Sequence, residues 1–287
     1  MEDSYLAPSQ RRGKVTIVRC DMSNVPDVYN MDHCNRGVAV VINNRDFTTL
    51  GVGCRGGTDQ DGREVAERWE ELGFDVRMYI NQTKKQMQEV MTQASKDDHS
   101  DSDCFVCVIL SHGEEDKIYG TDGPVEVTRL LDPFKGHRCP TLTGKPKLFF
   151  IQACRGKATD FGADVTDAVN MVGGDEDDDG DDTEEPVTYR IPTEADFLIA
   201  YSVVSGYYSW RDNIQGSVFI QALCEVLKEH GARLDLMTLM TRVNKMVAYG
   251  FEVQEIRDVK RPYVYKMKQI PSVVSMLTKD VYFRPKE

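Results

Sequence analysis

The sequence predicts an α/β protein built on a mostly parallel β-sheet, with helices on both of its faces. Apolar runs of strand length alternate along the chain with longer segments of helical periodicity, which is the order of strand–helix–strand units. The apolar runs are continuous and rich in β-branched residues, as expected of strands that are buried on both faces. The 287 residues are 40% hydrophobic, so a sizeable core can form.

The first expected strand is GVAVVINN, residues 37–44, because a β-branched run there ends in polar turn residues. A turn-rich stretch, GVGCRGGTDQDG, separates it from a helix expected over 63–74, where Val65, Trp69 and Leu72 keep helical spacing. The segment 84–95, KKQMQEVMTQAS, repeats the helical pattern.

The next two strands are expected in DCFVCVILSHG, residues 103–113, and KPKLFFIQACRG, residues 145–156. Cys104 and Cys107 form a CxxC in the first of them, but side chains at this spacing leave a strand on opposite faces. Because no second CxxC follows, we interpret both as core cysteines rather than metal ligands.

The last part of the chain continues the alternation. A fourth strand is expected in 195–205, ADFLIAYSVVS, then helices over 217–231 and 236–250, and a final strand near 272–277. The carboxyl ends of parallel strands form binding sites in such sheets, and the sequences SHG and QACRG lie at two of these ends.

An acidic stretch interrupts the fold. Residues 173–185 hold nine acidic side chains and no basic one, and without them the net charge changes from −12 to −3. Such a segment cannot bury enough apolar surface to order itself. We therefore divide the chain into a short, weakly ordered leader (1–35), a large catalytic part (36–167), an acidic linker (168–189) and a small part (190–287).

Composition excludes several classes of protein. The N-terminus lacks the apolar core of a secretory signal, and no segment approaches the roughly 18 apolar residues of a spanning helix. Eight cysteines without paired spacing predict free thiols in a reducing compartment. The near-neutral fold argues against nucleic acid as a partner, and we expect no membrane association, no metal and no cofactor.

Cys154 is the residue most suggestive of chemistry. It ends an apolar strand and is followed by Arg155, a cation that favours the thiolate. His112 precedes it by 42 residues at the end of another expected strand. The pentapeptide QACRG is a caspase signature, with its histidine expected about 50 residues upstream.

The chain resembles executioner caspases from Gly37 to Phe283. Besides QACRG, the resemblance rests on SHGEED, TGKPKLF, PTEADFLIAYS, GYYSWR and KQIPSVVSMLTK, which lie in both halves of the chain. It implies the caspase-like three-layer fold, with a mostly parallel six-stranded sheet. It also implies a cysteine endopeptidase that cleaves proteins after aspartate.

By this resemblance, Cys154 is the nucleophile and His112 delivers a proton to the leaving amine. The N–H groups of Gly113 and Cys154 form the oxyanion hole, where a glycine lets the backbone approach substrate closely. Arg55 and Arg211 match the arginines of the aspartate pocket.

Further residues are placed at the substrate by the same resemblance. Gln152 is the neutral partner of the two arginines, and Ser111 also contacts their pocket. Tyr208 and Trp210 wall the neighbouring subsites.

The outer subsite departs from the pattern of relatives that favour aspartate four residues before the cut. Those usually carry asparagine and tryptophan where this chain has Asp212 and Val218. An anion repels an acidic substrate residue, and valine leaves apolar space, so we expect an aliphatic preference there. The loop over 252–265 is also longer than in similar relatives.

The resemblance implies a zymogen that is cut in the linker, and we predict Asp167, which is followed by the small Ala168. The leader is too short for the recruitment modules of initiator caspases, so an upstream initiator is the expected activator. The active form is expected to be a homodimer of cleaved chains that pair through the last strand. Inhibitor-of-apoptosis proteins are expected partners, and the expected location is the cytoplasm, with the nucleus as a second compartment.

Three other hypotheses remain at this point. A catalytically silent homologue could act as a scaffold or dimerisation partner, although intact Cys154, His112 and both arginines argue against it. A relative specific for basic residues, such as a metacaspase or paracaspase, would need an acidic pocket. A zinc protein would need a ligand set that the cysteine and histidine spacing does not offer.

Overall fold

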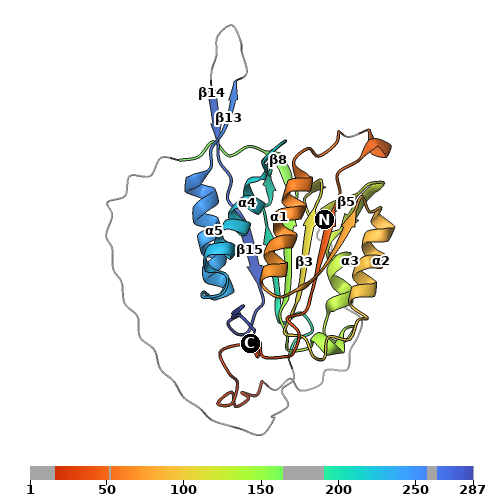
Figure 1. Cartoon of the computed structure of the whole chain (residues 1–287), viewed down its shortest axis with the longest axis vertical. Helices are drawn as coiled ribbons and strands as arrows, with labels where there is room; N and C mark the ends of the chain where they lie inside the picture. The colour runs from red at the N-terminus through yellow and green to blue at the C-terminus, as the bar shows by residue number, and fades with distance from the viewer. Residues whose placement is uncertain (1–16, 52, 164–190, 257–263, 287) are drawn as a thin grey trace, which may run out of the picture.

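The computed structural model describes residues 17–51, 53–163, 191–256 and 264–286. The predicted processing site Asp167 and the linker 168–189 lie outside the described residues. At the centre is a six-stranded sheet in the order β15-β9-β7-β3-β1-β2 (Figure 1). Its strands are β1 (Val38–Asn43), β2 (Asp75–Ile80), β3 (Phe105–Leu110), β7 (Lys147–Gln152), β9 (Phe197–Tyr201) and β15 (Ser272–Ser275).

The sheet confirms the predicted fold class. The five strands β2, β1, β3, β7 and β9 are all parallel, and only β15 in this sheet runs antiparallel, against β9. Strands β1, β3 and β7 are buried at every residue, which explains their unbroken apolar sequences. Strand β2, DVRMYI, was not predicted because it lies at the edge of the sheet, where charged residues interrupt the apolar ones.

Helices cover both faces of the sheet (Figure 1). One face packs against α1 (Thr58–Glu71), α4 (Val218–His230) and α5 (Leu236–Gly250), and the other against α2 (Lys84–Ala94) and α3 (Val127–Leu131). Successive strand residues alternate between the two cores, since Val106 and Val108 lie in the first and Cys107 and Ile109 in the second. Cys104 and Cys107 are both fully buried, in opposite cores, as predicted.

Short strands and turns surround this body. The small sheets are β4-β5-β6 (Gly113–Glu114, Lys117–Gly120, Gly123–Glu126), β8 with β10 (Gly156–Ala158, Gly206–Tyr207), β11 with β12 (Arg211–Asp212, Gly216–Ser217) and β13 with β14 (Val253–Ile256, Val264–Met267). The 3₁₀ turns are Thr48–Leu50, Asp132–Phe134 and Pro140–Leu142. Most of these loops gather at the carboxyl ends of the parallel strands.

Helix α1 begins five residues earlier than the sequence predicts. Its first turn, from Thr58, is polar and therefore gives no apolar period, yet Thr58 and Asp61 are completely buried. Gly57 precedes it in a left-handed conformation, φ 77°, which favours glycine. The buried polar turn indicates that this end of α1 belongs to a polar site.

The N-terminal segment contacts the body of the fold before β1 begins. Tyr29 and Met31 are buried, and the Tyr29 N–H donates to the carbonyl of Asp280 at 3.0 Å. Asp103 binds Arg36 at 3.0 Å and Lys286 at 2.8 Å, so one buried carboxylate joins the residues just before β1 to the C-terminal segment. Residues 27–35 of the predicted leader are therefore tied to the body of the fold.

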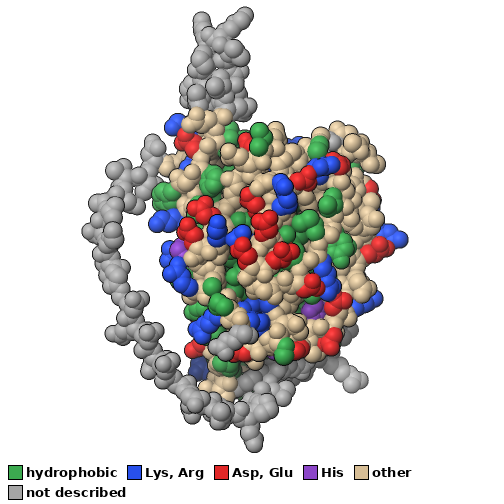
Figure 2. All heavy atoms as spheres, in the orientation of Figure 1, with side chains coloured by type: hydrophobic (Ala, Val, Ile, Leu, Met, Phe, Trp, Pro, Cys, Tyr) green, Lys and Arg blue, Asp and Glu red, His purple; other side chains and the backbone are tan. Residues whose placement is uncertain are grey.

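The face that carries α1 and α4 shows acidic and basic side chains interspersed, with no large area of one sign (Figure 2). This agrees with a fold that is nearly neutral outside the acidic stretch. None of the described helices is both long and apolar enough to cross a bilayer.

Candidate active site

Strand register brings His112 and Cys154 to the same edge of the sheet. Strands β3 and β7 are parallel neighbours in which Leu110 lies opposite Gln152, and each strand is followed two residues later by one of the two side chains. The Ser111 N–H donates to the Gln152 carbonyl at 3.1 Å, which keeps the chains together beyond the last strand residues. A thiol and an imidazole thus follow adjacent strand ends.

Cys154 is partly buried, and its Sγ lies 3.8 Å from the carbonyl oxygen of Ser209. Burial raises the pKa of the thiol, and the positive charges of Arg55 and Arg211 act in the opposite direction. Because the net shift is upward, the resting group is a thiol and a base must take its proton before it attacks.

His112 can serve as that base. Its ring packs edge-on against Phe47 with centroids 4.7 Å apart, and Nε2 is buried without a hydrogen-bond partner among the described residues. Burial lowers the pKa of His112, and so does the charge of Arg55. A hydrogen bond with the backbone of Gly53 raises the pKa and opposes these effects. The net result is a neutral imidazole near pH 7, which can accept a proton.

Gly53 was not predicted as a site residue. It acts through its backbone, so no side chain in the sequence marks it.

Close packing explains why position 113 is glycine. A Cβ there would lie 2.7 Å from the Cys154 carbonyl oxygen and 2.9 Å from that of Lys117. In the described part of the chain, the Cys154 N–H has no acceptor. The geometry therefore leaves this donor for a substrate oxygen, in line with the predicted oxyanion hole.

Two guanidinium groups lie near the nucleophile. Arg55 is 2% exposed, and its Nη1 donates to the Asn44 carbonyl at 3.0 Å and to Thr58 Oγ1 at 2.7 Å. Burial lowers the pKa of Arg55 to about 9, with a further contribution from the charge of Arg211. Arg211 reaches back from β11 and donates to the carbonyl of Gly56. Arg55 and Arg211 are thus both held by residues between the end of β1 and the first turn of α1, and together they form a cationic site suited to a carboxylate.

Gln152 is held by a buried chain of hydroxyl groups. Its Nε2 donates to Ser209 Oγ at 2.9 Å, and Ser209 in turn donates to Ser202 Oγ at 2.9 Å. Oε1 of Gln152 has no partner among the described residues. The structure buries Ser111 beside this group, with its hydroxyl donating to the Tyr119 carbonyl at 2.5 Å. Ser202 and Ser209 were missed because single serines carry no pattern.

The predicted outer-subsite residues surround a cavity of about 250 Å³. Its wall includes Trp210, Asp212 and Val218 together with Phe251 and Glu252. The Asp212 carboxylate accepts from the N–H groups of Ile214 at 2.7 Å and Gln215 at 2.8 Å. The hydrogen bond from Gln215 lowers the pKa of Asp212 most, and the bond from Ile214 lowers it further, so Asp212 remains anionic.

Tyr208 borders the same region. Its side chain is 44% exposed, and its ring packs edge to face against Trp210 with the ring centroids 4.8 Å apart. The two aromatic side chains therefore form an accessible wall beside the cavity.

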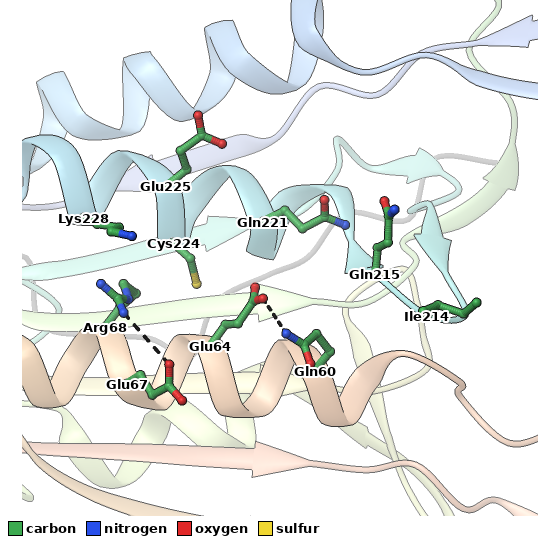
Figure 3. A pocket seen from close by; sticks show the side chains of 10 residues that line it. All are labelled: Gln60, Glu64, Glu67, Arg68, Ile214, Gln215, Gln221, Cys224, Glu225 and Lys228. Carbon is green, nitrogen blue, oxygen red and sulfur yellow. Dashed lines mark hydrogen bonds and ion pairs between the residues drawn. The ribbon is translucent and has the colours of Figure 1, made fainter.

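A larger groove of about 710 Å³ runs between α1 and α4 (Figure 3). Charged and amide side chains from both helices line it, with the buried thiol of Cys224 among them. None of the predicted site residues lines this groove, and burial raises the pKa of Cys224 strongly. Size alone therefore does not identify the catalytic site.

The cysteines give no indication of a metal site. All eight are free thiols. Within the described ranges, no group of three or more His, Cys, Asp or Glu side chains could hold a metal ion.

Comparison with known proteins assigns the family. The family model described as "Caspase domain" matches residues 36–282. Caspase-7 of Gallus gallus is 48% identical over 98% of this chain and 89% of its own length, and caspase-3 of Bos taurus is 46% identical over 91% and 89%. The crystal structure of caspase-1 from Spodoptera frugiperda is similar with a TM-score of 0.81 and 36% identity, over 94% of this chain and all of that one. The chain belongs to the caspase family and is an aspartate-specific cysteine endopeptidase of the executioner type.

Proposed function

We propose that this protease acts in apoptosis and that Cys154 and His112 perform its chemistry, with Arg55 and Arg211 holding the substrate aspartate. The observation that carries the proposal is the placement of a thiol and a neutral imidazole at neighbouring strand ends, within the field of two arginines. No other cysteine in the described residues combines partial exposure with such neighbours.

In the proposed reaction, the two guanidinium groups bind the aspartate carboxylate and position the following peptide bond. His112 takes the proton of Cys154, and the thiolate attacks the scissile carbonyl. The backbone N–H groups of Gly113 and Cys154 stabilise the oxyanion. His112 then protonates the leaving amine, and a water molecule hydrolyses the thioester to release the acid and the thiol.

An electrophilic peptide that ends in aspartate tests this proposal. We expect a peptidyl-aspartyl fluoromethyl ketone to label the wild type and the Cys54→Ala variant, but not Cys154→Ala. Cys54 is a suitable control because its thiol is exposed and adjacent to Arg55. Labelling elsewhere, or none in a folded wild type, would instead favour the silent scaffold.

We further propose an aliphatic preference four residues before the cut. Trp210, Val218 and Phe251 form an apolar part of the cavity wall, and the anionic Asp212 lies at its edge. A tetrapeptide library should show valine or leucine preferred over aspartate. Val218→Trp combined with Asp212→Asn should shift the preference toward aspartate; an acidic preference in the wild type would refute the proposal.

Activation is proposed to follow cleavage after Asp167, at the boundary between the large part and the acidic linker. The support is the sequence around Asp167 and its distance from the dense acidic run. Asp167→Ala should keep the protein as a single band on a denaturing gel under conditions that give two bands for the wild type. An unchanged two-band pattern would show that another residue is used, and an upstream initiator caspase is the expected source of the first cut.

Two cleaved chains are proposed to pair through β15. This strand bonds β9 on one side only in the described structure, and Val274 is 45% exposed. Sedimentation should give the mass of a dimer, and Val274→Lys should give the monomer.

Cytoplasmic and nuclear location, and binding of inhibitor-of-apoptosis proteins, remain proposals for fractionation and pull-down experiments.

A further inference from the structure

Asp61 is a buried carboxylate in the first turn of α1 that the reaction above does not use. It is 0% exposed, and it accepts hydrogen bonds from the Ser217 N–H at 2.7 Å and from Ser217 Oγ at 2.5 Å. Neutral groups could fill this position with the same shape. An ionised carboxylate in such a place calls for a charge partner or a function.

The charge partners of Asp61 are the two pocket arginines. Ser217, which binds the carboxylate, pairs with Arg211 across the small sheet of β11 and β12. Arg55 lies on the other side, where its Nη1 binds Thr58 in the same helical turn as Asp61. The charges of Arg55 and Arg211 both act on Asp61, and both stabilise its ionised form.

Packing fixes the carboxylate in this place. A Cβ at Gly216 would lie 2.2 Å from Oδ1 of Asp61, so the backbone of the small half touches the carboxylate directly. A Cβ at Gly57 would lie 2.2 Å from the carbonyl oxygen of Asp212. The loop before α1 and the strands β11 and β12 therefore approach without a gap, and the two hydrogen bonds from Ser217 hold the Asp61 carboxylate in place between them.

The total charge of this group follows by counting. Arg55 and Arg211 contribute two positive charges and Asp61 one negative, which leaves one positive charge for a ligand to neutralise. We propose that Asp61 is a specificity-determining residue, whose negative charge matches the pocket to a monoanionic aspartate and disfavours dianionic side chains such as phosphoserine. This inference rests on the proposed assignment of Arg55 and Arg211 to the aspartate pocket.

The energetics of Asp61 support a role for its charge. Burial raises the pKa of Asp61 to about 6, even though the hydrogen bonds from Ser217 and both arginines oppose the shift. The ionised form is therefore less stable in the folded protein than in the unfolded chain. Asparagine would have nearly the same shape without that penalty, so fold stability alone does not account for the carboxylate.

The test uses one peptide with asparagine, aspartate or phosphoserine at the cut position, and compares wild type with Asp61→Asn. We expect the ratio of kcat/KM for phosphoserine to that for aspartate to rise about tenfold in the variant, because one more positive charge acts in a poorly solvated site. The matched control is Glu64→Gln, which removes a charge one turn along α1, where the side chain lines the groove between α1 and α4 (Figure 3). Its ratio should equal that of the wild type.

Further variants separate charge from geometry. Ser217→Ala removes a hydrogen bond that lowers the pKa of Asp61, so its ratio is measured at pH 8.5, where the carboxylate stays ionised, and should then equal the wild-type value. Asp61→Ser is a second neutral replacement, for use if circular dichroism shows that the asparagine variant does not fold. An unchanged ratio in a folded neutral variant would overturn the inference, whereas a wild type that cleaves equally after aspartate and asparagine would overturn the proposed pocket.

Discussion

Burial raises the pKa of Cys154 whereas the nearby positive charges lower it, but both burial and those charges lower the pKa of His112. The thiol is disfavoured as an anion by burial and favoured by Arg55 and Arg211. The imidazole is disfavoured as a cation by burial and by Arg55. The pair therefore rests as thiol and neutral imidazole, and the proton moves when substrate is bound.

This state has a consequence for the pH dependence of activity. Since protonated His112 cannot accept the Cys154 proton, kcat/KM should fall on the acidic side with a midpoint below 6.5, the usual pKa of histidine. The measurement is kcat/KM between pH 5 and 8 at constant ionic strength. A midpoint at 7 or above would contradict the predicted direction of the pKa shift.

Asp61 should make stability depend on pH. The pKa of Asp61 is about 6 in the folded protein, higher than its ordinary value of 3.8. The stability that the protonated carboxyl contributes is therefore fully present below pH 3.8 and is lost as the pH rises through 6. At pH 7.5 the loss is about 3 kcal/mol, from roughly 1.4 kcal/mol per pKa unit. The free energy of urea unfolding should therefore favour Asp61→Asn over the wild type by a larger margin at pH 7.5 than at pH 4.5. A difference independent of pH would contradict the raised pKa.

Among the elements, those with long apolar runs could be predicted and those with polar or edge positions could not. Strands β1, β3, β7 and β9 are buried, so their sequences show them directly. Strand β2 and the first turn of α1 are polar because one lies at an edge and the other at the pocket.

The same distinction applies to the site. Cys154 and His112 follow predicted strand ends, and the parallel register then determines that they meet. Gly53, Ser202 and Ser209 act through a backbone group or a hydroxyl network that exists only after folding. Arg55 and Arg211 could be paired only through the family resemblance, since their positions in the sequence are distant.

The start of β4 should not tolerate a side chain at position 113. Gly113→Ala would place a methyl group against the carbonyl oxygens of Cys154 and Lys117, which would displace the proposed oxyanion donor. We expect kcat to fall by about 10² or more, as for loss of an oxyanion-hole donor. Gly136→Ala is the control, because its nearest contacts, at 3.7 Å and beyond, leave room for the methyl group. Equal activity of both variants would argue against the role of Gly113.

At the scale of the whole molecule, the two halves of the chain are joined by more than the linker. Strands β7 and β9 flank the linker in sequence and are parallel neighbours in the sheet. Helix α1 from the large part packs with α4 from the small part in one core. The Tyr29 hydroxyl donates to Asp196 at 2.7 Å, which joins the N-terminal segment to the small part. Cutting the linker therefore leaves the core contacts in place.

Asp103 should be important for global stability. Asp103→Ala would leave the buried guanidinium of Arg36 without its carboxylate and would release Lys286. Removing one partner of a buried ion pair costs about 3–5 kcal/mol. Urea unfolding should show this loss, whereas Asp98→Ala, at an exposed carboxylate, should change stability little. A small loss in Asp103→Ala would mean that the two ends are held mainly by apolar contacts.

The segments that hold Val28 and Asp280 lie at the end of the sheet opposite the proposed catalytic residues. Val28 bridges Asp280, and Asp103 and Asp196 mark the starts of strands whose other ends lead to His112 and the pocket loops. A fluorescent protein or affinity tag joined close behind Lys286, which binds Asp103, would therefore lie on the side of the enzyme away from the proposed catalytic residues. Reporters attached there should leave peptide access unobstructed, so turnover can be followed in labelled, surface-tethered molecules.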